Sequence, residues 1–225
     1  LIQGGALQRT RKKEVNIVPR NFHQDDLLGL IEDKNINIVF ATGPAGTGKT
    51  FISTLAGIRG LKDNKIDKFV VTRPAVSVDE QHGFLPGTLQ EKMAPWTRPI
   101  MDCFEEYYSP DQIEYMLNDN KIEVAPLAYM RGRTFKNSYI IADEMQNATD
   151  NQMKMLLTRI GDNSKLIVTG DLAQHERGYE SNGLKCFIER LTKLGSDRIK
   201  VVQFEHTDIE RHPVVTEVLR LYDEA

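Results

Sequence analysis

The sequence has little of what marks secreted, zinc-binding or membrane proteins. Cysteine occurs only twice among 225 residues, as Cys103 and Cys186, and the two form no metal or redox motif. The five histidines show no H-E-x-x-H or similar zinc spacing. No apolar run approaches the roughly 20 residues of a membrane span, and no secretory hydrophobic segment is visible. We therefore expect a protein of a reducing compartment, the cytoplasm, with no membrane partner.

A large excess of charge of one sign is also absent. The chain has 29 basic and 32 acidic residues, so its net charge of −3 gives the surface as a whole no attraction for polyanions. A nucleic-acid site would have to be a local patch. A basic cluster from Arg9 to Lys13 could contact a phosphate backbone or belong to a solvated terminus. We expect a flexible basic arm over residues 1–20 and one domain over residues 21–225.

A phosphate-binding loop is present near the start of this domain. It fits the pattern G-x-x-x-x-G-K-[ST] and lies between an apolar strand pattern and a helical pattern. Glycines let the backbone N–H groups curl around an anion, and the helix adds the positive end of its dipole. Lys49 would reach the β- and γ-phosphates of ATP, and the Thr50 hydroxyl would bind Mg²⁺. The loop is Gly43-Pro44-Ala45-Gly46-Thr47-Gly48-Lys49-Thr50.

A second apolar strand pattern, residues 138–142, runs into two acids, as in a Walker B element. Asp143 would hold Mg²⁺ through water. Glu144, next to a bound γ-phosphate, could orient and deprotonate the attacking water. A strand that simply runs into a polar loop is the alternative, and the phosphate-binding loop upstream favours the functional interpretation.

Two further residues follow later strand patterns. Gln174 comes after the apolar run 165–171 and could hydrogen-bond the γ-phosphate or the attacking water. Arg211 lies between the last strand pattern and a helix that begins near Pro213, where it could act as an arginine finger. A salt bridge with a nearby glutamate is the alternative for Arg211.

Gln24 has two interpretations. Asn21 and Gln24 have capping-box spacing ahead of an apolar helical face. Gln24 also lies just upstream of the phosphate-binding loop, and a side-chain amide can pair with both N7 and the N6 amine of adenine. The residues alone leave both roles open.

Residues 74–108 differ in composition from the rest, with four prolines and the only tryptophan. Because proline interrupts helices, we expect an insertion of loop and short helix on the rim of the core. Arg73, Trp96 and Arg98 could contact single-stranded nucleic acid by charge and stacking. A small aromatic core and surface ion pairs are the alternatives.

Arg131 and Arg133 flank a glycine and suit phosphate binding or a subunit interface. Ordinary surface arginines are the alternative.

Together, several runs resemble the PhoH-like family of P-loop ATPases, related to the RecA-like core of superfamily 1 helicases. The resemblance covers about residues 21–222. Beside the phosphate-binding loop, it rests on Thr72-Arg73-Pro74-Ala75-Val76, Gly83-Phe84-Leu85-Pro86-Gly87, Met130-Arg131-Gly132-Arg133-Thr134-Phe135, Ala142-Asp143-Glu144-Met145-Gln146-Asn147, Thr169-Gly170-Asp171 with Gln174, and Arg211-His212-Pro213.

The resemblance implies an ATPase whose site residues have the roles argued above, and it favours Gln24 as an adenine reader. It also implies a link to RNA and assembly into rings. We expect a three-layer α/β P-loop fold with a mainly parallel sheet, the two nucleotide strands near its centre and the helix near Pro213 packed back on it.

For function, we expect an Mg²⁺-dependent ATPase coupled to RNA or single-stranded DNA, working as a homo-oligomeric ring such as a hexamer. Arg131 or Arg133 are candidates to complete a neighbour's site in such a ring. The alternative is a regulatory ATP-binding module that assembles with little turnover and no unwinding.

Overall fold

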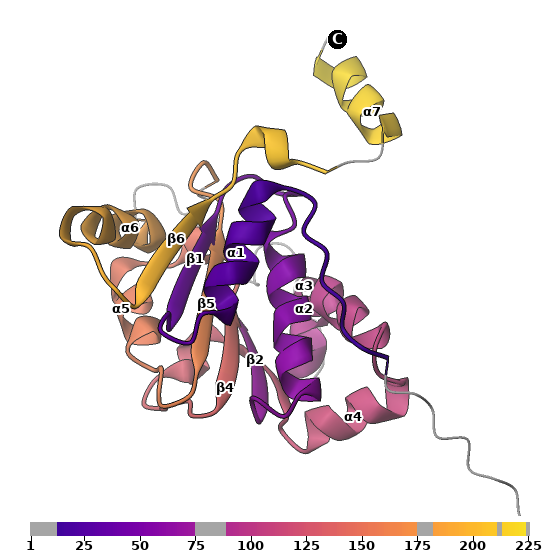
Figure 1. Ribbon diagram of the computed structural model, residues 1–225, viewed down its shortest axis with the longest axis vertical. Helices are drawn as coiled ribbons and strands as arrows, with labels where there is room; N and C mark the ends of the chain where they lie inside the picture. The colour runs from indigo at the N-terminus through magenta and orange to yellow at the C-terminus, as the bar shows by residue number, and fades with distance from the viewer. Residues whose placement is uncertain (1–12, 75–88, 175–181, 211–212, 224–225) are drawn as a thin grey trace, which may run out of the picture.

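The computed structural model describes residues 13–74, 89–174, 182–210 and 213–223, and its centre is a parallel sheet (Figure 1). The strands lie in the order β3-β2-β4-β5-β1-β6, and every neighbouring pair is parallel. The predicted α/β fold with a mainly parallel sheet is confirmed. The strands are β1 (Ile38–Thr42), β2 (Lys68–Arg73), β3 (Ile122–Pro126), β4 (Ser138–Ala142), β5 (Lys165–Gly170) and β6 (Ile199–Gln203).

Helices cover both faces of the sheet, which explains why the interior strands β1 and β4 are buried along their whole length. Alternate strand residues enter two separate cores: Val39 and Ala41 point to one, Ile38 and Phe40 to the other. The first core contains α1 (Phe22–Glu32), α2 (Lys49–Lys62), α3 (Leu89–Glu105) and α4 (Pro110–Asn118), and the second contains α5 (Asp150–Leu157), α6 (Gly183–Leu194) and the short 3-10 helices η1 (Leu127–Met130) and η2 (Met145–Asn147).

Helix starts follow the local sequence closely. The side chains of Asn21, Ser109 and Thr149 accept hydrogen bonds from backbone N–H groups in the first turns of α1, α4 and α5. At α4 and α5, the side chain of a glutamine in the first turn also accepts a hydrogen bond from the backbone N–H of the N-cap residue, which completes a capping box. The helix start predicted at Asn21 is confirmed, and the Ser-x-x-Gln and Thr-x-x-Gln spacings of residues 109–112 and 149–152 make the other two starts readable from the sequence in the same way.

The expectation of a loop with a short helix on the rim is wrong for the second half of residues 74–108. Helix α3 has 17 residues and contains both Pro95 and Pro99. The two prolines are one turn apart on the exposed face, where the carbonyls they leave unpaired can bond to water. The opposite face carries Ile100 and Phe104 into the first core, where Phe104 packs edge-on against Phe69. The region is part of a layer of the fold.

Residues 13–20, assigned from the sequence to a flexible arm, lie against the folded body instead. Val15 and Ile17 are buried in the first core. Lys13 donates a hydrogen bond to the Glu106 carbonyl and lies over the Tyr107 ring. The domain therefore begins before residue 21, and the basic residues before Lys13 lie outside the described residues.

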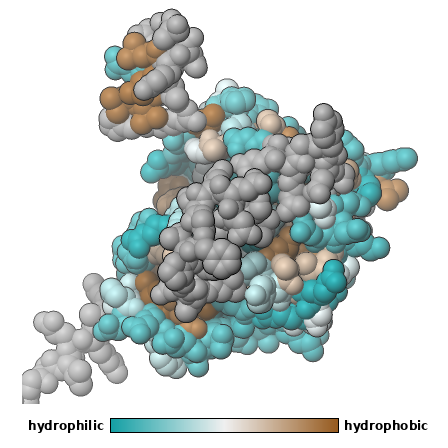
Figure 2. Space-filling view, turned by 180° about the vertical axis from the view of Figure 1, so that it is seen from behind, coloured by the Kyte–Doolittle hydropathy of each residue, from teal (hydrophilic) through white to brown (hydrophobic). Residues whose placement is uncertain are grey.

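Helix α7 (Pro213–Asp223) does not pack back on the sheet, which corrects the expectation for the chain end. It stands apart from the body in Figure 1 and shows apolar side chains on its surface in Figure 2. Val214, Val218 and Leu221, spaced along one face, are 53, 45 and 60% exposed.

None of the helices in the described parts of the chain is long and apolar enough to cross a bilayer.

The strand order determines which strand ends can together form a ligand site. Strand β5 lies between β1 and β4, so the carboxyl ends of these three strands are neighbours at one edge of the sheet. Ligand sites of open parallel sheets lie at this edge. Both predicted nucleotide strands, β1 and β4, are interior strands of the sheet.

Candidate active site

The phosphate-binding loop connects β1 to α2, the context that its sequence pattern requires. Gly48 ends the loop with a left-handed backbone (φ 83°, ψ 7°) as the N-cap of α2. A side chain at this position would be strained, and its Cβ would lie 2.6 Å from Nε2 of Gln24. Glycine is therefore required for both the backbone conformation and the close approach of Gln24.

Lys49, the first residue of α2, folds over the loop. Its ammonium donates hydrogen bonds to the carbonyls of Gly43 (2.7 Å) and Pro44 (2.5 Å) and to the Thr47 hydroxyl (3.2 Å). Burial lowers the pKa of Lys49, and the nearby carboxylates Asp171, Asp143 and Glu144 offset part of this effect by attraction. The charged form is thus held among acceptors at the mouth of the loop.

An oxygen-rich cluster lies next to Lys49. The Thr50 hydroxyl donates to Oδ1 of Asp143 over 3.2 Å, and the Thr169 hydroxyl of β5 donates to the same oxygen. Carboxylate and hydroxyl oxygens are the hard ligands that Mg²⁺ takes in nucleotide sites, usually with several waters retained. This donor set fits Mg²⁺, with Thr50 and Asp143 as the residues that would hold it.

Glu144 follows directly and has a left-handed backbone (φ 55°, ψ 37°), rare for a residue with a side chain. Such strain at the end of a buried strand marks functional sites. Its carboxylate accepts a hydrogen bond of 2.5 Å from Nε2 of Gln146.

These residues line one cavity of about 200 Å³ at the carboxyl edge of the sheet. Gln174 from the turn after β5 reaches the same cavity, so three neighbouring strand ends contribute to it. The lining residues are Gly43, Ala45, Gly46, Gly48, Lys49, Thr50, Phe51, Asp143, Glu144, Gly170, Asp171 and Gln174.

Gln24 lies behind the loop and is 4% exposed. Its backbone N–H is capped by Asn21, so the predicted capping relation is present. Its side chain does something else: Oε1 accepts from the Arg20 N–H (2.9 Å), and Nε2 donates to the Thr47 carbonyl (3.1 Å) and to Glu210 (3.3 Å). An adenine would have to replace one of these partners.

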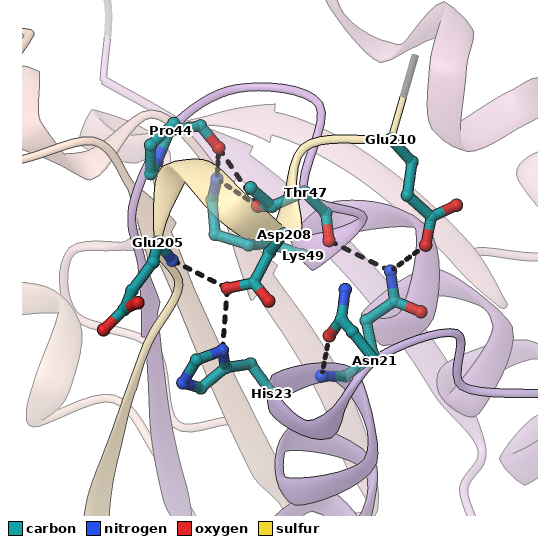
Figure 3. A network of polar contacts seen from close by, with 9 residues as sticks. Asn21, His23, Pro44, Thr47, Lys49, Glu205, Asp208 and Glu210 are labelled. Atoms are coloured by element: carbon teal, nitrogen blue, oxygen red, sulfur yellow. Dashed lines mark hydrogen bonds and ion pairs between the residues drawn. The ribbon is translucent and has the colours of Figure 1, made fainter. Parts of the chain in front are cut away.

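The segment after β6 is fastened to the loop through the same network (Figure 3). The backbone N–H of Glu210 donates to the Gly46 carbonyl (3.0 Å), and its carboxylate accepts from Arg20 (2.6 Å). Asp208 pairs with His23 of α1 at 2.7 Å and also accepts from the Glu205 N–H. The loop tip, the start of α1 and residues 205–210 thus form one connected unit.

Among the described residues, the other arginine candidates and Trp96 do not line the cavity. Arg73, at the end of β2, lies 5.7 Å from the Trp96 ring centre, so these two contact one another. Arg98 pairs with Asp102 and Glu105 on the exposed side of α3.

Arg133 forms a two-pronged ion pair with Glu123 of β3 and lies over the Phe135 ring. Arg131 is exposed at the end of η1. Arg211 falls outside the described residues.

Four residues in and around the site were not among the predicted ones. Asp171 lines the cavity, Thr169 holds Asp143, Gln146 holds Glu144, and Glu210 fastens the loop tip. The runs Thr169-Gly170-Asp171 and Glu144-Met145-Gln146 carried a signal for three of them, because each ends a buried strand at the ligand edge.

Comparisons with known proteins agree with this geometry. The family described as PhoH-like protein matches residues 16–223. A PhoH-like protein of Synechocystis is 40% identical over 223 residues, 99% of this chain and 66% of that protein. A PhoH-like protein of Bacillus subtilis is 45% identical over 192 residues, 84% of this chain and 59% of that protein.

The chain thus spans about two thirds of the length of these relatives or less. Among solved structures, the DNA-bound DUF1998 helicase MrfA is 14% identical with a TM-score of 0.47 over 81% of this chain and 27% of that one. That likeness is distant, and the family assignment rests on the first comparisons. With a family match over nearly its whole length, the chain belongs to the PhoH-like protein family.

Proposed function

We propose that this protein binds ATP with Mg²⁺ and hydrolyses it. One observation carries the proposal: Lys49, the Thr50–Asp143 pair and Glu144 line the same cavity, together with Gln174. This set covers every role that phosphoryl transfer to water requires, namely phosphate binding, metal binding and water activation. The adenine would lie toward Gln24.

In the proposed reaction, the Lys49 ammonium exchanges its loop carbonyls for β- and γ-phosphate oxygens. Thr50 and Asp143 would hold Mg²⁺, which would supply positive charge to the phosphates. Glu144 accepts a proton from the water that attacks the γ-phosphorus, and the β–γ bridging bond breaks to release ADP and phosphate. Gln174 hydrogen-bonds the γ-phosphate or that water, and Arg211 supplies positive charge in cis or from a neighbour.

We further propose that hydrolysis is coupled to RNA or single-stranded DNA. The pair of Arg73 and Trp96 supports this, because it combines a cation with an aromatic ring at the ligand edge of the sheet. Stacking of bases on such rings is the common mode of binding single strands. Arg133 is a weaker candidate for nucleic acid or for a neighbour's site, since Glu123 already neutralises it; Arg131 stays a candidate for either.

The alternative function is an ATP-binding module that assembles with little turnover. The exposed apolar face of α7 favours assembly of copies, which could close into a ring. This assembly is compatible with both functions.

A phosphate-release assay distinguishes the two. We expect Mg²⁺-dependent ATP hydrolysis that poly(U) RNA or single-stranded DNA stimulates, with Lys49→Ala as the inactive control that no longer binds ATP. Arg73→Ala should lose stimulation and keep basal turnover. Basal hydrolysis without stimulation by any single strand would refute the coupling, and tight ATP binding with no hydrolysis would favour the alternative.

A further inference from the structure

The side chain of Gln146 connects the ends of two strands of the site. Gln146 lies in η2, two residues after Glu144, and is only 2% exposed. Its Nε2 donates to the Glu144 carboxylate over 2.5 Å, and its Oε1 accepts from the Asp171 backbone N–H over 3.1 Å. One buried amide therefore joins the carboxyl end of β4 to that of β5.

The chemistry of the two partners fixes the orientation of this amide. A carboxylate only accepts and a backbone N–H only donates, so the flipped amide would be repelled at both ends. Packing fixes its position as well, because a Cβ added at Gly170 would lie 2.8 Å from Oε1 of Gln146 and 3.2 Å from its backbone nitrogen. The amide therefore packs directly against the backbone of Gly170, where no larger residue would fit without a shift.

Glu144 is not part of a helix: its backbone is left-handed, and only the short 3-10 helix η2 follows it. Its carboxylate is therefore oriented by its hydrogen bond rather than by the packing of a helix. A hydrogen bond to a charged carboxylate is about twice as strong as one between neutral groups. On the β5 side, the Asp171 carbonyl accepts the Gln174 N–H over 3.2 Å. Gln146 thus links the Glu144 carboxylate to the backbone of the turn that carries Gln174.

We infer that Gln146 is a positioning residue for hydrolysis: it aims the Glu144 carboxylate and couples it to the turn that carries Gln174. The inference rests on the proposed ATPase function and deepens it. Gln146 contacts neither nucleotide nor water in this role, so it acts on turnover rather than on affinity.

The first test replaces the amide by an apolar side chain of similar length, Gln146→Met. We expect a kcat at least about 10-fold lower, and an ATP dissociation constant within about threefold of that of the unchanged protein. Gln152→Met is the matched control, because Gln152 also uses Oε1 to accept a backbone N–H, from Thr149, but lies in the capping box of α5. The control should keep its kcat.

The second test uses Gln146→Glu, which keeps an acceptor for the Asp171 N–H and places a carboxylate against Glu144. Two carboxylates in contact repel each other, so the Glu144 carboxylate loses its aimed position while the contact with the Asp171 N–H is kept. The kcat of this variant should therefore fall at least as far as that of Gln146→Met, again with an ATP dissociation constant within about threefold of that of the unchanged protein. A purely structural role, in which only the contact with Asp171 matters, would leave the kcat of this variant close to that of the unchanged protein.

The outcomes separate this inference from the proposed function. Hydrolysis by the unchanged protein, with normal kcat in Gln146→Met or in Gln146→Glu, would overturn the positioning role and leave the ATPase intact. A loss of kcat matched by an equal loss of ATP affinity would also overturn it. Absence of hydrolysis in the unchanged protein would overturn both.

Discussion

The ion pair between Arg133 and Glu123 allows a quantitative prediction about stability. Hydrogen bonds from Arg133 are the main cause that lowers the pKa of Glu123 from its ordinary 4.5 to about 2, partly opposed by burial and assisted by Lys68. The side chains of Arg133, Glu123 and Lys68 are 36, 16 and 27% exposed, respectively. They join β3 to β2 and to the segment after η1.

The size of the effect follows from the pKa. One pKa unit corresponds to about 1.4 kcal/mol, so the full difference between 4.5 and about 2 gives an upper limit of about 3.4 kcal/mol. Because Arg133 is more than one third exposed, solvent screens part of the interaction, and about 2 kcal/mol is a fairer expectation. We expect Glu123→Gln to lower the free energy of unfolding by about this amount at pH 7.

The sign of the pH dependence is fixed as well. A carboxyl group with a lowered pKa in the folded state stabilises the fold above its unfolded pKa, and this contribution disappears as the pH falls from about 4.5 to about 2. The stability difference between the unchanged protein and Glu123→Gln should therefore shrink over this window. Urea unfolding followed by circular dichroism, at pH values from 7 down to 3, measures it.

Glu114→Gln, which removes an exposed carboxylate from α4, is the control and should change stability by less than about 0.5 kcal/mol. A difference for Glu123→Gln that stays constant between pH 5 and pH 3, or that is no larger than that of the control, would refute the reasoning. Such a result would also make Arg133 a stronger candidate for binding a phosphate of nucleic acid or of a neighbouring subunit's nucleotide.

Three further predictions concern the nucleotide site. Glu144→Gln should bind ATP but hydrolyse it at least about 100-fold more slowly, and unchanged single-turnover rates would assign the base elsewhere. Arg211→Ala should lower kcat more than ATP affinity, as measured by steady-state kinetics beside calorimetric titration; if neither changes, the residue makes a surface ion pair. Glu210→Ala removes the acceptor of Gln24 and Arg20 and should weaken ATP and ADP binding alike by about threefold, whereas an affinity equal to that of Glu217→Ala on α7 would contradict its role at the loop.

The parts of the fold that the sequence predicted correctly depend on short-range patterns. The phosphate-binding loop, the acidic end of β4 and the capped starts of α1, α4 and α5 each occupy fewer than ten residues, and their backbone geometry follows from those residues. The parallel sheet follows because strands and helices alternate along the chain.

The incorrect expectations each depended on a distant partner. Whether prolines break α3 depends on which face they occupy and on what packs against the other face, here Phe69. The apolar face of α7 was visible in the sequence, but its distance from the sheet was not. In the same way, no local pattern identified Glu123, on another strand, as the partner of Arg133, whose proposed roles stay predictions.

Dependence on a partner that is distant in the sequence also explains why the role of Gln146 was not predicted. Its importance depends on β5 lying beside β4, a pairing between segments about 25 residues apart that no local pattern specifies. Gln146 and the hydrogen bond from Thr169 to Asp143 tie the end of β4 to β5, and Glu210 ties the loop tip to the segment after β6. A shift of the phosphate-binding loop at Gly46 would therefore strain its hydrogen bond to the Glu210 N–H and act on residues 205–210, which form one connected unit with the loop tip.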